Sequence, residues 1–296
     1  MQNKFEGVGV AIVTPFKSTG AVDYNALERI VEHIIKGGVD FIVVQGTTGE
    51  AATLVHDEKL AVLEFVIEVT KQRVPVVFGY GGNSTHAMTE GLSNYPLDKI
   101  DALLVASPYY NKPSQKGIYE HYKALVAATK TPLILYNVPG RTGSNMSAET
   151  MLQLAKDFPS IVAVKEASGD LHQMAQLIKH KPEGFSVLSG DDDLVFPQTA
   201  MGADGVISVI ANAFPRRFSE LVKAGREGTV TTAREYHYQF LDVIPLLFKE
   251  GNPGGIKALL SMLGIADNYL RLPLVPISKA TYDELYRAAS EAGLTE

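Results

Sequence analysis

A lysine, a tyrosine, two threonines and an arginine each stand at or just after the end of a short apolar run of this sequence. Lys165 follows "IVAV", Tyr136 lies in "PLILYN", Thr47 and Thr48 lie in "GTTGE", and Arg141 lies in "VPGRTG". An uncharged lysine amine condenses with a ketone or aldehyde, and a tyrosine hydroxyl can donate and accept the protons. The planar arginine fork suits a substrate carboxylate. The pattern indicates carbonyl chemistry through a lysine imine.

Each of these residues also has an ordinary structural explanation. A lysine at a strand end usually extends its alkyl stem to solvent. Tyr136 could be a core aromatic whose hydroxyl bonds the backbone. The two threonines could be turn residues in a glycine-flanked loop, and Arg141 could be a solvated loop residue. The elements that position these side chains therefore decide between the two interpretations.

Eight apolar runs alternate with segments of helical periodicity almost to residue 226. The runs are 8–16, 41–46, 75–81, 102–108, 132–137, 161–166, 185–190 and 205–212. They are continuous rather than alternating, which is typical of parallel strands covered on both faces. Eight such units fit the roughly 250 residues of a (β/α)8 TIM barrel, so this α/β fold is predicted. An open doubly wound sheet is the alternative, but it usually has fewer strands and a glycine-rich nucleotide loop.

Polar residues mark several helix starts, and the strands stop near the C-terminus. Asp23, Ser147 and Ser278 each precede a segment of helical periodicity, which predicts N-caps. After residue 228 only helical patterns remain. We therefore predict a catalytic barrel over residues 1–228 and a C-terminal helical region over residues 229–296 that packs on it. We expect this region to serve packing or assembly rather than chemistry.

The composition excludes several classes of protein. The 296 residues carry a net charge of −6 and contain no cysteine, so disulfides and thiol nucleophiles are absent. The acidic balance, without a block of Lys and Arg, argues against nucleic acid or an anionic membrane as a partner. No apolar run approaches the roughly 18 residues of a membrane span, and the N-terminus shows no signal-peptide pattern. These features predict a cytoplasmic protein.

No cofactor motif stands out either. Asp191, Asp192 and Asp193 resemble metal ligands, but they precede "LVFPQTAMG", so we predict that they cap the following helix. The histidines form no H-E-x-x-H pair and no tight cluster. The stretch "GYGGN" lacks the spacing of a nucleotide-binding loop. The sequence therefore predicts chemistry without a metal or organic cofactor.

The predicted barrel favours the catalytic interpretation of the lysine. Catalytic residues of such barrels lie at the C-terminal ends of the strands. Lys165 ends the sixth run, Tyr136 lies at the end of the fifth, and Thr47 follows the second. The fold would therefore place all three side chains at one mouth of the barrel, where Lys165 faces hydroxyl groups instead of bulk water.

Five motifs carry a resemblance to a known family. "GTTGEAATL", "SPYYNKPSQKGIYEHY", "LYNVPGRTG", "VAVKEASGD" and "SGDDDLVFP" follow in this order at the predicted strand ends. Together they resemble the dihydrodipicolinate synthases, class I Schiff-base aldolases related to N-acetylneuraminate lyase. The resemblance implies a carbon–oxygen lyase of diaminopimelate and lysine biosynthesis. Such an enzyme condenses pyruvate with L-aspartate 4-semialdehyde to 4-hydroxy-tetrahydrodipicolinate.

The resemblance also implies catalytic roles. Lys165 would form the imine with pyruvate, and Tyr136 would donate and accept protons in a relay with Thr47 and Tyr110. In this family, Tyr110 comes from the neighbouring subunit, so a dimer would be the smallest active unit. The assembly would be a homotetramer, a dimer of dimers.

Substrate contacts follow from the same resemblance. Thr48 and the backbone at Ile207 would bind the pyruvyl group, Gly190 would line the pocket, and Arg141 would hold the carboxylate of the semialdehyde. N-acetylneuraminate lyases and 2-keto-3-deoxy-sugar acid aldolases share the lysine and tyrosine, and they remain the alternative. Arg141 favours the synthases because it suits a short aldehyde that bears a carboxylate. A non-catalytic barrel is disfavoured because all these residues are present.

Some members of the family that this sequence resembles are inhibited by L-lysine, which they bind at the tight dimer interface. At the corresponding effector site this chain matches sensitive members at Asn83, Tyr109 and His56. It has Lys59 where they have a second histidine, and Ala87 where they have a glutamate. Loss of the carboxylate and gain of a cation should repel the ammonium group of L-lysine. The sequence therefore predicts weak or absent inhibition.

Overall fold

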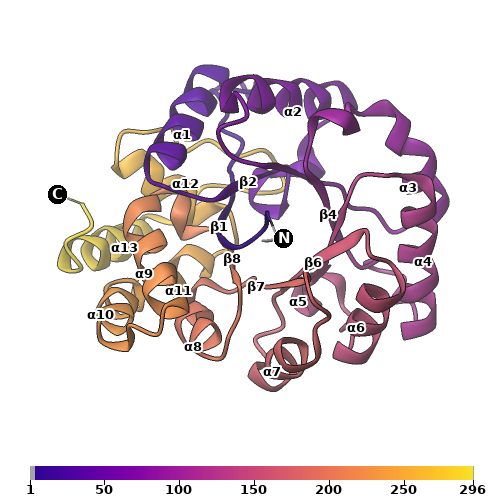
Figure 1. Cartoon of the computed structure of the whole chain (residues 1–296). Coiled ribbons are helices and arrows are strands. Elements are labelled where there is room, and N and C mark those ends of the chain that lie inside the picture. The colour runs from indigo at the N-terminus through magenta and orange to yellow at the C-terminus, as the bar shows by residue number, and fades with distance from the viewer. Residues whose placement is uncertain (1–3, 296) are drawn as a thin grey trace.

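Eight parallel strands close into a barrel in the computed structural model, which describes residues 4–295 (Figure 1). Each strand pairs with the next along the chain, and β8 pairs with β1. The strands are β1 (Gly7–Ala11), β2 (Phe41–Val44), β3 (Val76–Gly79), β4 (Ala102–Ala106), β5 (Leu133–Asn137), β6 (Ile161–Glu166), β7 (Ser186–Ser189) and β8 (Gly205–Ser208). Apart from Gly7, every strand residue lies within its predicted run. The predicted TIM barrel is confirmed.

Two apolar layers explain why the strand sequences are hydrophobic on both faces. In β5, Ile134 and Tyr136 belong to a cluster inside the barrel, whereas Leu133 and Leu135 belong to the layer between strands and helices. This alternation follows from the two-residue period of a strand. Both layers are buried, so a polar side chain inside the barrel meets solvent only at its mouths.

Helices surround the barrel (Figure 1). The side chains of Asp23 and Ser147 accept hydrogen bonds from the first turn of their helices, as predicted. These outer helices are α1 (Tyr24–Lys36), α2 (His56–Thr70), α3 (Thr85–Gly91), α4 (Gln115–Ala128), α5 (Pro139–Thr142), α6 (Ala148–Asp157), α7 (Leu171–His180), α8 (Val195–Ala200) and α9 (Pro215–Arg226). Among residues 4–295, no helix is both long and apolar enough to cross a membrane.

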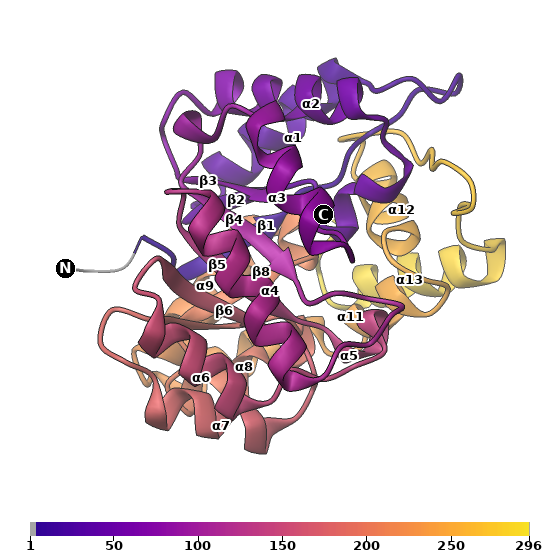
Figure 2. The same ribbon diagram turned by 90° about the vertical axis from the view of Figure 1, so that its right-hand side faces the viewer.

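The C-terminal region is helical, as expected. It contains α10 (Val230–Phe240), α11 (Ile244–Phe248), α12 (Gly254–Met262) and α13 (Lys279–Glu291), and Ser278 caps α13. Figure 2 shows α11, α12 and α13 beside the end of the barrel that lies away from the N-terminus. A division of the chain at residue 228 stays a prediction.

The prediction that the three aspartates cap the helix after them is wrong. Asp192 Oδ2 instead accepts hydrogen bonds from the backbone N–H groups of Val209 (2.9 Å) and Ile210 (2.8 Å). Leu194 precedes α8 and contributes no side-chain cap. Asp192 therefore caps the turn after β8, which the pairing of β7 with β8 brings beside it. Burial raises the pKa of Asp192 to about 6.

Candidate active site

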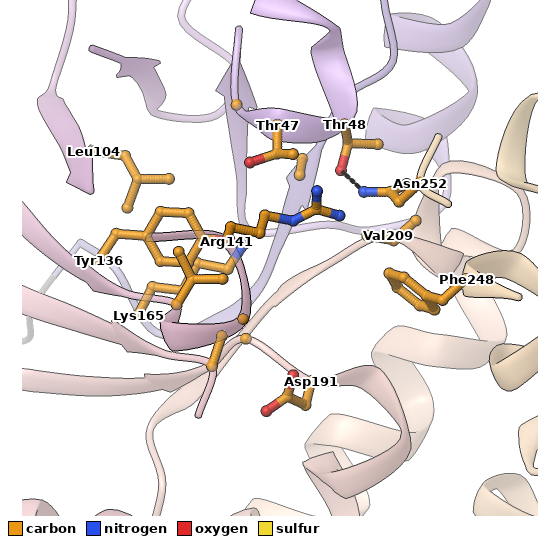
Figure 3. Close-up of a pocket in the computed structure, with 16 residues that line it drawn as sticks. Thr47, Thr48, Leu104, Tyr136, Arg141, Lys165, Asp191, Val209, Phe248 and Asn252 are labelled. Carbon is orange, nitrogen blue, oxygen red and sulfur yellow. Dashed lines mark hydrogen bonds between the residues drawn. The ribbon is translucent and has the colours of Figure 1, made fainter. Parts of the chain in front are cut away.

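A cavity of about 410 Å³ opens among the loops that follow the strands (Figure 3). Six of the predicted site residues line it, namely Thr47, Thr48, Tyr136, Arg141, Lys165 and Gly190. They come from the loop after β2, from β5, from α5, from β6 and from the end of β7. The barrel thus brings together side chains that lie far apart in the sequence.

Lys165 and Tyr136 are neighbours across the pairing of β5 with β6. The register places Tyr136 opposite Lys165, and the Lys165 Nζ lies 4.4 Å from the centre of the Tyr136 ring. Lys165 is only 6% exposed, yet it lines the cavity. No salt bridge engages its ammonium among residues 4–295. The amine is therefore directed into the cavity with the tyrosine at its side.

The residues that follow this pair are tied together on the outer face of the barrel. Asn137 Nδ2 donates to Glu166 Oε2 at 3.0 Å, and Gln173 Nε2 donates to the same oxygen at 3.0 Å. Burial raises the pKa of Glu166. Because Asn137 follows Tyr136 and Glu166 follows Lys165, these hydrogen bonds hold the two catalytic candidates in register. This network was not predicted from the sequence, although Asn137 and Glu166 directly follow Tyr136 and Lys165 along the chain.

The loop that carries Thr47 and Thr48 is held in a strained conformation. Thr47–Gly49 forms a single 3₁₀ turn, and the flanking Gln45 (φ 58°) and Glu50 (φ 53°) have left-handed backbone conformations. Such conformations are unfavourable for residues other than glycine and persist only where surrounding contacts impose them. A Cβ at Gly79 would approach the Gln45 carbonyl oxygen to 2.4 Å, so glycine is required there. Packing therefore fixes where the two threonine side chains point.

The C-terminal region supplies two residues of the cavity wall, Phe248 and Asn252. Asn252 Nδ2 donates a hydrogen bond to Thr48 Oγ1 at 3.0 Å, shown as the dashed line in Figure 3. The expectation that this region serves only packing or assembly is therefore too narrow. The "NP" dipeptide at 252–253 signals a helix start, but nothing local signals its contact with Thr48.

Asp191 also lines the cavity, which the cap prediction did not anticipate. Burial raises the pKa of Asp191 to about 6, the neighbouring Asp193 adds to the rise, and Lys165 opposes it. Its Oδ2 has no hydrogen-bond partner among the described residues. This buried oxygen therefore lies beside the cavity without a hydrogen-bond partner in the described part of the chain.

Two predicted residues do not line the cavity. Tyr110 is 88% exposed and has a φ of 73°, and Ile207 is fully buried in β8. Within the described part of the chain, no hydrogen bond joins Tyr136 to Thr47 or Tyr110. The relay among these hydroxyl groups stays a prediction, as does the contact at the Ile207 backbone.

A second cavity of about 470 Å³ adjoins the first and shares Thr47, Tyr136 and Arg141 with it. Of the residues predicted for an effector site, Tyr109 and Lys59 line it. The other three, Asn83, His56 and Ala87, lie outside its wall. His56 Nδ1 lies 3.3 Å from the hydroxyl of Tyr95, which lines the cavity.

No group of three or more His, Cys, Asp or Glu side chains within residues 4–295 is arranged to hold a metal ion. The polar groups that meet at the first cavity are an amine, a phenol, two hydroxyls, a guanidinium, an amide and a carboxylate. This set can form an imine, move protons and bind carboxylate groups.

Comparisons with known proteins agree with this chemistry. A model of the dihydrodipicolinate synthetase family matches residues 4–292. The 4-hydroxy-tetrahydrodipicolinate synthase of Phocaeicola vulgatus is 49% identical over 291 residues, which cover 98% of each chain. That of Parabacteroides distasonis is 50% identical over 95% of this chain and 94% of its own. The crystal structure of dihydrodipicolinate synthase from Aquifex aeolicus superposes with a TM-score of 0.94 at 41% identity, covering 98% of this chain and 99% of that one. Because the match spans nearly the whole chain at this identity, the protein belongs to the dihydrodipicolinate synthetase family.

Proposed function

We propose that this protein condenses pyruvate with L-aspartate 4-semialdehyde through an imine on Lys165 and yields 4-hydroxy-tetrahydrodipicolinate. It acts as a lyase in the formation of diaminopimelate and lysine, the activity for which its relatives at 49% and 50% identity are named. The observation that carries the mechanism is the buried amine of Lys165 beside the Tyr136 ring, in a cavity that also contains Arg141.

The first half of the reaction makes a carbon nucleophile. The uncharged Lys165 amine attacks the ketone carbon of pyruvate, and the carbinolamine loses water to give a protonated imine. Tyr136 passes one proton from the nitrogen to the oxygen as the carbinolamine forms and then donates its own proton to the departing hydroxyl, so that the imine stays protonated. The imine then draws electrons from the adjacent methyl group, which loses a proton to the Tyr136 phenolate to give an enamine. The Thr48 hydroxyl binds the pyruvyl carboxylate during these steps.

The second half joins the two substrates and frees the enzyme. The enamine carbon attacks the aldehyde carbon of the semialdehyde, and the aldehyde oxygen takes a proton from Tyr136 to become a hydroxyl. The semialdehyde amine then attacks the imine carbon, and the C–N bond to Lys165 breaks as the ring closes. Arg141 holds the semialdehyde carboxylate in a bidentate grip, which brings the aldehyde to the enamine.

Reduction with borohydride tests the proposed function. With pyruvate present, reduction should leave a pyruvyl adduct on the peptide that contains Lys165, detected by mass spectrometry. The same protein should turn over aspartate semialdehyde and leave N-acetylneuraminate uncleaved. An unmodified Lys165 peptide would refute the imine mechanism. Efficient cleavage of N-acetylneuraminate would instead identify a sugar-acid lyase.

The role of Arg141 predicts a selective defect. Arg141→Ala should raise the KM for the semialdehyde roughly 10- to 100-fold, the effect of losing a charge-assisted hydrogen bond to a carboxylate. Trapping of pyruvate on Lys165 should stay close to wild type, because the first half of the reaction does not use the guanidinium. Steady-state kinetics with each substrate varied in turn measures this. Arg234→Ala, which changes an exposed arginine on α10, is the matched control. Loss of pyruvate trapping in Arg141→Ala would show that the role is misassigned.

Two residues of the predicted effector site, Lys59 and Ala87, predict weak feedback inhibition. We expect millimolar L-lysine to leave the activity of the wild-type protein nearly unchanged, because Lys59 adds a cation and Ala87 removes a carboxylate. The double variant Lys59→His, Ala87→Glu should become measurably more sensitive, since it restores a group that attracts an ammonium ion. Activity measured against L-lysine concentration compares the two proteins. Half-inhibition of the wild type at millimolar L-lysine would overturn the prediction.

Assembly into a homotetramer, a dimer of dimers, belongs to the same proposal, and so does a cytoplasmic location for this biosynthetic step. The exposure of Tyr110, 88% in a single chain, supports a role for this side chain outside its own barrel. Tyr110 lies in the loop after β4 and has a left-handed backbone conformation. In a dimer, Tyr110 would complete the hydroxyl relay of a neighbouring site.

A further inference from the structure

We infer that Asn252 is a positioning residue that makes the Thr48 hydroxyl a hydrogen-bond donor toward the carboxylate of bound pyruvate. The inference rests on the proposed function, in which Thr48 binds the pyruvyl group. Asn252 lies between α11 and α12, and it is separated from Thr48 by 204 positions of the sequence. Both side chains line the same cavity (Figure 3).

The direction of one hydrogen bond carries the argument. A threonine hydroxyl has one hydrogen to donate and two lone pairs that accept. Asn252 Nδ2 donates to Thr48 Oγ1 at 3.0 Å, so this contact uses a lone pair and leaves the hydroxyl hydrogen for another partner. No protein acceptor takes that hydrogen among the described residues. A carboxylate in the cavity is the acceptor that this arrangement suits.

Burial makes the orientation stable. Thr48 is 2% exposed and Asn252 is 7% exposed, so water competes little for their mutual hydrogen bond. The amide oxygen Oδ1 of Asn252 has no partner in the described part of the chain. The two side chains therefore orient each other, and loss of either one leaves the other without its partner.

A buried ion pair holds the two segments in place. Lys257 of α12 contacts the Oε1 atom of Glu50, which follows the Thr47–Gly49 turn, and the two side chains are only 2% and 0% exposed. The Lys257 ammonium also donates to the Tyr269 carbonyl at 2.9 Å and lies 4.2 Å from the centre of the Phe16 ring. The loop after β2 and the start of α12 are thus joined by two independent contacts. The ion pair sets the distance between the two segments, and Asn252 contacts Thr48 where these segments line the cavity.

Two substitutions at Asn252 separate positioning from packing. Asn252→Ala removes the donor, and the affinity for pyruvate should fall about fivefold to tenfold, as expected for the loss of one hydrogen bond between neutral groups. Asn252→Asp keeps the size but can only accept when ionised, so it should turn the Thr48 hydrogen toward itself and repel the pyruvate carboxylate. We expect a larger loss for Asn252→Asp than for Asn252→Ala. A purely structural role predicts the reverse order, because the aspartate preserves the shape.

A double-mutant cycle with Thr48→Val tests whether Asn252 acts through Thr48. The measured quantity is the pyruvate concentration that gives half-maximal borohydride trapping on Lys165, together with the KM for each substrate. If Asn252 acts through Thr48, adding Asn252→Ala to Thr48→Val should change pyruvate affinity less than twofold. The KM for the semialdehyde should stay within about twofold in all variants, since a carboxylate held by Arg141 sets it. Asn94→Ala, at an exposed position that does not line the cavity, is the control and should behave as wild type.

The outcomes distinguish this inference from the proposed function. A wild-type protein that pyruvate and borohydride do not label refutes the proposed function itself. Normal labelling of the wild type, with effects that simply add in the double variant, refutes only the role of Asn252. Unchanged pyruvate affinity in Asn252→Ala would do the same. Circular dichroism and thermal unfolding of each variant show whether a loss of affinity reflects a loss of fold.

Discussion

Lys165→Ala will abolish the condensation, with kcat reduced on the order of 10⁴-fold or more, because no other lysine among the described residues lines this cavity. Lys165→Arg should be equally inactive, since a guanidinium keeps its charge and forms no imine with pyruvate. Both variants should lose the reduced pyruvyl adduct. Steady-state turnover and mass spectrometry of the trapped protein measure the two effects.

The comparison with a surface lysine makes this prediction specific. Lys130→Ala changes an exposed lysine and should retain full activity and labelling. The far-ultraviolet circular dichroism of the Lys165 variants should match that of the wild type. Lys165 forms no salt bridge in the described chain, so its substitution breaks no ion pair. A Lys165→Ala protein that still gains a pyruvyl adduct would place the imine on another lysine and contradict the mechanism.

Lys257→Met will lower the free energy of unfolding by about 3–5 kcal/mol, the usual cost of leaving one member of a buried ion pair without its partner. Glu50 would remain fully buried, with the backbone N–H of Arg271 at 3.2 Å as a remaining hydrogen-bond donor. Burial lowers the pKa of Lys257 to about 8, whereas the attraction of Glu50 opposes this shift. Urea-induced unfolding followed by circular dichroism measures the change.

Two further variants control this experiment. Lys249 and Glu284 form a similar contact at 2.5 Å, but both side chains are 49% exposed, so Lys249→Met should cost about 1 kcal/mol or less. The double variant Lys257→Met, Glu50→Gln should recover much of the lost stability, because no unpaired charge remains buried. Equal losses in Lys257→Met and Lys249→Met would show that the buried pair has no special structural role.

The barrel could be predicted because its signals are local. Apolar strands, helical periodicity and capping residues such as Asp23 and Ser147 each depend on neighbours a few positions away. Lys165 and Tyr136 could also be identified, because a lysine or tyrosine at the end of an apolar run conflicts with its surroundings. The (β/α)8 topology then requires both side chains to meet at one mouth of the barrel.

The missing parts of the site involve contacts between distant segments. The "NP" dipeptide at 252–253 signals only a helix start, and no local pattern singles out Lys257, yet the fold brings both Asn252 and Lys257 against the loop after β2. Asp192 was expected to cap its own helix and instead caps the turn after β8. For each of these side chains, several donors or acceptors along the chain are possible partners. The local sequence does not indicate which of them is the partner in the folded protein.

Sequence alone therefore determined the fold class and singled out Lys165 and Tyr136, the residues proposed to form the imine and to transfer protons, because periodicity and the placement of polar groups within apolar runs are local properties. Tertiary structure alone decided that the C-terminal region contributes to the cavity wall and that Asn252 donates a hydrogen bond to Thr48. It also decided that a buried ion pair joins α12 to the loop after β2. The physical reason is that hydrogen bonds and ion pairs depend on distances of about 3 Å, which are set only when closure of the barrel brings the segments together.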